Sequence, residues 1–195
     1  MPTNSKGVIF ISYRRLDHRT DEAVLIRNAL RDRGVPTWRD IDNLESQPTE
    51  DELIKVLRSD DTSGAVILIA KEVADSTMIK NVEAPRIFKR HNNSDGFIIK
   101  PVLIDVRYEE ADQILNSPAG FQDLGNWNLH KVNGEVITEA QARFVANEVL
   151  KARLDQISLQ HKNLPLDISI NSRTTPDPSL NALQHNFSPY FDGRD

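Results

Sequence analysis

VIFISY, residues 8–13, is the stretch that decides the fold of this chain. Before Ser12 it contains only apolar, β-branched and aromatic residues, which is typical of a strand buried on both faces. Such strands belong to parallel sheets covered by helices. The polar turn that follows opens at the carboxyl edge of the sheet, where open α/β sheets bind ligands. We therefore expect the first strand to position a site.

Strand and helix patterns alternate along the rest of the chain. Apolar runs predict further strands over residues 35–39, 65–70 and 97–106, and a weak fifth strand around 127–130. Helical spacing of apolar residues predicts helices after residue 17, after residue 49, from Ser76 to about residue 90, and over residues 139–161. In the last of these, one side is expected to carry Ala142, Val145, Val149, Ala152 and Leu154. The expected fold is an α/β, doubly wound, flavodoxin-like sheet of five parallel strands with helices on both faces.

Composition excludes several classes of function. The chain has 195 residues, no cysteine and a net charge of −5, which argues against disulfides, thiolate metal sites and a DNA or RNA partner. Its histidines lack the spacing of a zinc site, and no run of apolar residues approaches the length of a membrane span. We expect a soluble, cytoplasmic protein without a bound metal or cofactor.

The C-terminal tail departs from the alternating pattern. We predict one domain over residues 1–162, and a linker or the start of a second domain over residues 163–195. The second interpretation is favoured because Leu164, Leu166, Ile168 and Ile170 alternate with more polar residues, as in a strand.

The chemical signal lies on the third predicted helix. Ser76, Ile79, Glu83 and Ile87 follow one another at spacings of three and four residues, so a carboxylate falls in a stripe that should face the protein. Pro85 disturbs the backbone two residues later. Functional sites are where such local rules are broken. The alternative is that Glu83 turns aside to pair with a cation one helical turn away.

Several of these residues together resemble the box pattern of the TIR domain family. They are Phe10-Ile11-Ser12-Tyr13 with Asp17, then Leu30, Gly34, Trp38 and Asp40, then Ser76 and Glu83, then Ile99-Lys100-Pro101-Val102. The likeness covers roughly residues 7 to 160. It also accounts for Pro101 within the fourth predicted strand, because TIR domains have a proline there. The C-terminal tail, together with residues 123–124 and 127–130, is similar to bacterial TIR proteins that continue into a SAVED domain. The SAVED domain is a sensor for cyclic oligonucleotides made during phage infection.

The resemblance implies an NAD glycohydrolase of anti-phage immunity, because many bacterial TIR domains cleave the bond between nicotinamide and ribose with one glutamate. Glu83 matches that glutamate. The resemblance places Ser12, Tyr13 and Arg14 against the nucleotide, with Trp38 and Leu44 as a wall for a flat base. Ser76 is a further residue that is predicted to contact NAD.

These assignments compete with structural roles. Trp38 also fits a core position of its strand, Arg14 fits a solvated turn, and Ser76 fits a helix cap. At the level of function, the enzyme would be switched on when a sensor stacks copies head to tail through the loop 40–47. The alternative is a non-catalytic TIR adaptor that uses the loop only for association. A phosphate receiver with Asp105 as acceptor lacks the acidic pair expected after the first strand.

Overall fold

The computed structural model describes residues 7–39, 50–93, 96–115, 130–132 and 134–162. Within them, five strands form one parallel sheet in the order β2-β1-β3-β4-β5. The strands are β1 (Val8–Ser12), β2 (Thr37–Trp38), β3 (Thr62–Ile69), β4 (Ile98–Ile104) and β5 (His130–Val132). This order is the flavodoxin-like one, so the winding direction reverses between β1 and β3. The predicted fold class is confirmed.

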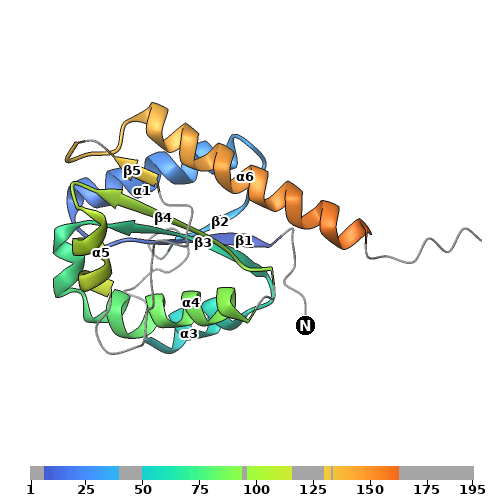
Figure 1. Cartoon of the computed structure of the whole chain (residues 1–195), viewed down its shortest axis with the longest axis horizontal. Coiled ribbons are helices and arrows are strands. Elements are labelled where there is room, and N and C mark those ends of the chain that lie inside the picture. Colours follow the sequence, from blue (N-terminus) through green and yellow to red (C-terminus); the bar gives the residue numbers. More distant parts are fainter. Residues whose placement is uncertain (1–6, 40–49, 94–95, 116–129, 133, 163–195) are drawn as a thin grey trace, which may run out of the picture. The chain divides into compact units, whose positions relative to one another are not determined.

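Helices cover both faces of the sheet (Figure 1). One face carries α1 (Asp17–Arg31) and α6 (Glu139–Lys162), and the other carries α3 (Glu50–Arg58), α4 (Ala84–Asn92) and α5 (Tyr108–Leu115). Two short turns join β3 to α4: the 3₁₀ turn η1 (Lys71–Asp75) and the π-helical turn η2 (Ile79–Glu83).

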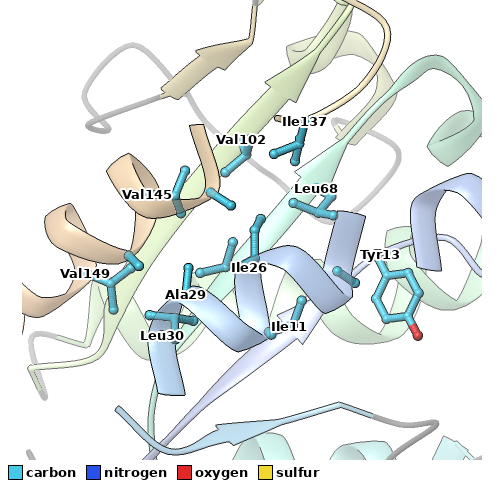
Figure 2. Packing of buried hydrophobic residues seen from close by; sticks show 14 of the residues in the cluster. Ile11, Tyr13, Ile26, Ala29, Leu30, Leu68, Val102, Ile137, Val145 and Val149 are labelled. Carbon is cyan, nitrogen blue, oxygen red and sulfur yellow. The ribbon is translucent and has the colours of Figure 1, made fainter. Parts of the chain in front are cut away.

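The alternation of side chains along β1 divides the core into two clusters. Ile9 and Ile11 pack with the buried stripe of α1 and α6, as Figure 2 shows for Ile11, Ile26, Val145 and their neighbours. Phe10 faces the other way, toward α3, η2 and α4. Because side chains alternate with a period of two, Ser12 is directed to the same face as Phe10.

One prediction about an individual element is wrong in detail. Leu154, expected on the buried side of the last helix, is 53% exposed, whereas the neighbouring Arg153 is buried and donates hydrogen bonds to Gly7 O and Ser63 Oγ. Pro101 ordinarily indicates an edge strand or a bulge, yet β4 lies between β3 and β5. Among the residues that the structure describes, β4 pairs with β5 at Val102, Leu103 and Ile104, which follow the proline.

The remaining structural predictions fall partly outside the described residues. These are the loop 40–47 with Leu44, the start of the fifth strand at 127–129, and the tail 163–195. None of the helices that the structure describes is long and apolar enough to cross a membrane.

Candidate functional site

The candidate site lies at the carboxyl edge of the sheet, where β1 and β3 end. Ser12 is the last residue of β1 and pairs in register with Ile67 of β3. This is the point at which the strand order reverses, and two neighbouring connections leave the sheet on opposite faces there. Such a crevice is the usual ligand site of open α/β sheets.

Glu83 reaches this edge from the π-helical turn η2. The amide of Ala84 donates to Ile79 O, five residues back, so one residue is added to the ordinary helical turn. The next residue, Pro85, has no amide hydrogen and its ring would clash with the carbonyl of Asn81 in a regular α-helix. The wider π turn accommodates this proline. Single π turns inside helices occur frequently at functional sites.

Ser12 and Glu83 form a buried pair. Ser12 Oγ donates a hydrogen bond of 2.5 Å to Glu83 Oε2. Ser12 is 1% exposed and Glu83 is 7% exposed. A carboxylate removed from water is costly unless hydrogen bonds compensate it, and hydrogen bonds to charged groups are among the strong ones. The predicted inward position of Glu83 is confirmed.

The alternative partners of Glu83 are engaged elsewhere. Lys80 Nζ donates to Ala74 O at 2.7 Å, and Arg86 Nη1 donates to Val82 O at 2.8 Å. The geometry thus favours the inward carboxylate over a surface ion pair.

Trp38 stacks on the strand residue beside it. Its ring lies 5.0 Å from the Phe10 ring, with an angle of 11° between the planes, and the two residues are register partners. Trp38 is half-buried and packs against the cluster that contains Phe10 and Ile79. It therefore has a core role, on the sheet face that carries Glu83. Leu44, the other predicted wall residue, lies outside the described residues.

Tyr13 and Arg14 diverge after the end of β1. Tyr13 packs into the cluster under α1 and α6, on the sheet face opposite Glu83. Figure 2 shows its ring at one end of that cluster, with the hydroxyl directed away from the aliphatic side chains. Arg14 is half-buried, and its Nη1 donates to the carbonyl of Glu72 at 2.8 Å. Their contacts with a nucleotide stay predictions.

Ser76 has the capping role that its position suggests. Its Oγ accepts a hydrogen bond of 3.3 Å from the amide of Ile79, the first residue of η2. A serine hydroxyl at such a place satisfies a donor that the helix leaves unpaired. The predicted contact of Ser76 with a ligand is not tested by this hydrogen bond and stays a prediction.

A charge network beside the site was not predicted from the sequence. Arg19 Nε donates to Glu72 Oε1, and Arg19 Nη1 donates to both oxygens of Glu22 at 2.8 Å. Desolvation raises the pKa of the Glu72 carboxyl, but the hydrogen bond from Arg19, with smaller contributions, outweighs it and leaves this pKa below its usual value. Glu72 in η1 is thereby tied to α1.

The same network also holds the start of α6. Glu22 Oε1 accepts from the amide of Ile137 at 2.9 Å, and Arg19 Nη1 donates to Glu135 O at 3.0 Å. The spacing of Arg19 and Glu22 is a local signal of an ion pair within a helix. Glu72 and Glu135 have no such signal, because they meet Arg19 only in the folded chain.

Within the described ranges no three histidine, aspartate or glutamate side chains are grouped as metal ligands. The hydrogen bond from Ser12 is one of the contacts that hold the Glu83 side chain in place.

Comparison with known proteins finds similarity to solved structures only. No protein-family model and no curated protein matches the chain. Among solved structures it is similar to the TIR domains in the structure of the activated Roq1 resistosome directly recognizing the pathogen effector XopQ. The identity is 21%, the TM-score is 0.44, and the match covers 80% of this chain and 84% of that chain. The fold described above rests on the strand order and helix layers, not on this match.

Proposed function

We propose that the chain is a TIR-type NAD glycohydrolase that releases nicotinamide from NAD and leaves ADP-ribose, linear or cyclic. The observation that supports this proposal most is the buried hydrogen bond between Ser12 and Glu83 at the switch point of the sheet. It holds one anion where a ligand of such a fold is expected. The box residues described in the sequence add the family resemblance.

One carboxylate is sufficient for this reaction. Glycosidases that cleave ordinary glycosides need a second carboxyl group to protonate an alkoxide leaving group. Nicotinamide is bound to ribose as a cationic pyridinium, so the C1′–N bond breaks with its electron pair going to nitrogen and a neutral base leaves. Water then adds to C1′, for the linear product, and its proton passes to the solvent. No acid is required in the cleavage step.

Glu83 has the properties that the remaining task needs. The transition state carries positive charge on the ribose ring, and a preorganised anion in a site that excludes water stabilises such charge strongly. The same carboxylate accepts hydrogen bonds from ribose hydroxyls in the proposed complex. Ser12 is assigned as the residue that orients it, because its hydroxyl contacts Glu83 Oε2 directly.

The proposal also includes how the enzyme is switched on. We assign activation to head-to-tail self-association in which the loop 40–47 of one copy completes the pocket of the next. The signal would be a cyclic oligonucleotide bound by a C-terminal sensor, in bacterial anti-phage defence in the cytoplasm. Heterologous contacts of this kind build open filaments.

Nicotinamide release from clustered protein tests the proposal. The chain, carrying a histidine tag, is concentrated on nickel-bearing vesicles and incubated with NAD, and nicotinamide is quantified by chromatography. We expect release by the wild type and by Glu109→Gln, an exposed carboxylate of α5, and none by Glu83→Gln. Absence of release in every clustered state would contradict the enzyme and leave the non-catalytic adaptor.

A further inference from the structure

A pocket of about 610 Å³ lies at the amino edge of the sheet. The connection 34–36, which leads into β2, forms one wall together with Arg31 at the end of α1. The other wall is one side of α6, where helical spacing brings together Leu150, Arg153, Leu154 and Ile157. The volume is within the range of roughly 300–1,000 Å³ that small-molecule sites occupy. Since the candidate site lies at the carboxyl edge of the sheet, the two are separate.

The pocket is lined mainly by apolar side chains. They are Val35, Pro36, Leu150, Leu154 and Ile157, and none of the described residues that line the pocket is acidic. Leu154 is exposed to solvent, although an apolar side chain of its size gains free energy from burial. An apolar lining with a small number of polar groups is the usual composition of a small-molecule site. The pocket therefore suits a ligand with an apolar part.

Arg153 brings a buried positive charge to this pocket. It is 6% exposed, and a guanidinium stays protonated in proteins. In the part of the chain that the structure describes, no carboxylate pairs with it. Burial lowers the pKa of Arg153, with no neighbouring charge to offset the effect. Because a buried charge without a partner is costly, an anion that reaches Arg153 gains a favourable interaction.

Part of the Arg153 guanidinium has no acceptor. Both of its hydrogen bonds use Nη2, which donates to Gly7 O and Ser63 Oγ, whereas its buried Nε has no partner among the described residues. Arg31 also lines the pocket, and its Nε donates to Thr37 Oγ1 at 3.2 Å. Arg31 lies in the last turn of α1 and offsets the partial negative charge of that helix end. The charge that a ligand meets is therefore mainly the single charge of Arg153.

We propose that this pocket binds a small monocarboxylate with an apolar chain, whose carboxylate lies at Arg153 and whose chain lies along Leu150, Leu154 and Ile157. One negative charge balances one buried cation, and the two oxygens of a carboxylate match the planar guanidinium. The wall from Leu150 to Ile157 is about 10 Å long at the rise of an α-helix. An extended chain of about eight carbons spans this length.

Calorimetric titration of the whole chain with octanoate, below the concentration at which it forms micelles, tests this site. We expect saturable binding of one octanoate per chain. Binding of 1-octanol, which has the same chain without the charge, should be about tenfold weaker or more, because hydrogen bonds to a charged group are lost. Acetate should also bind about tenfold more weakly or worse, because it lacks the apolar chain.

Two leucines of α6 provide a matched pair of variants. Leu154→Glu places a negative charge in the wall of the pocket, and we expect it to weaken octanoate binding about tenfold or more. Leu159→Glu makes the same change at an exposed leucine that does not line the pocket, and it should change the affinity less than twofold. Melting curves from circular dichroism check that both variants fold. A third variant, Arg153→Met, should lose the preference for octanoate over 1-octanol.

Four results would overturn the proposal. The first two are the absence of saturable octanoate binding and equal affinities of the wild type for octanoate and 1-octanol. The third is equal octanoate affinity of the wild type and Leu154→Glu. The fourth is a wild-type dimer in sedimentation that Leu154→Glu dissociates and that does not bind octanoate, since the pocket would then be a contact between copies. Glu83→Gln should bind octanoate like the wild type, so this test is independent of the proposed NAD cleavage.

Discussion

The buried pair of Ser12 and Glu83 predicts a measurable coupling between two residues that are 71 positions apart in the sequence. Ser12→Ala removes a donor at 2.5 Å from a carboxylate oxygen while leaving the volume of the core almost unchanged. A hydrogen bond to a charged group contributes about 1.5–3 kcal/mol. We therefore expect Ser12→Ala to lower the free energy of unfolding by about 2 kcal/mol.

A double-mutant cycle isolates this contribution. In Glu83→Met the carboxylate is absent, so Ser12→Ala should then cost less than about 0.5 kcal/mol, and the coupling energy should be about 1.5–2 kcal/mol. Urea unfolding of the four proteins, followed by circular dichroism, gives the four free energies. Ser63→Ala serves as the control, since Ser63 is a buried serine that contacts Gly7 O and not Glu83.

Additivity would refute the reasoning. If the free energies of Ser12→Ala and Glu83→Met add within about 0.3 kcal/mol, as they do for sites without contact, the two side chains do not form the pair. For Ser63→Ala combined with Glu83→Met, additivity is the expected result, because Ser63 contacts Gly7 O and not Glu83.

Three further predictions concern packing and charge. Gly64→Ala should destabilise the fold by about 2–3 kcal/mol in urea unfolding, because a Cβ there would lie 2.6 Å from Ile98 O; a loss below that of Gly34→Ala, which meets no atom within 4 Å and is disfavoured only by its φ of +70°, would contradict this. The lowered pKa of Glu72 contributes stability above its usual value of 4.5 that is lost as pH falls through the lower folded pKa, so Glu72→Gln should flatten the acid side of a stability profile, and an unchanged profile would show that the pair with Arg19 does not form. Burial lowers the pKa of Lys100, which lies 3.7 Å from Glu148; Lys100→Met should leave the melting temperature unchanged or raise it, because an apolar side chain avoids the desolvation cost, and a large fall would indicate that the ion pair stabilises the fold.

The periodicity of the chain predicted most of the fold. VIFISY and the apolar run at residues 65–70 identified the two central strands, because strands buried on both faces leave little ambiguity. The second strand has only two residues, Thr37–Trp38, and so carries too little pattern to fix its ends. The exposure of Leu154 was missed because a long helix can continue past the surface that buries it, and helical spacing does not record where that surface ends.

The candidate site was predictable only in part. The stripe of Ile79, Glu83 and Ile87 placed the carboxylate inward, and Pro85 signalled a broken helix, which the structure forms as a π turn. The direction of Tyr13, on the opposite sheet face from Glu83, follows from the alternation along β1. Contacts between distant segments, such as Arg19 with Glu72, depend on the assembled edge and have no signature in local spacing.

The measurement that tests the central claim most directly is NAD cleavage by clustered Glu83→Gln beside clustered wild type, with NAD binding measured for both. Loss of a preorganised charge at the reacting centre predicts a fall in the rate of nicotinamide release of about 100-fold or more, with NAD affinity changed only a few-fold because the rest of the site is intact. Equal rates in the two proteins would contradict the account, since the carboxylate held by Ser12 would then have no part in the chemistry.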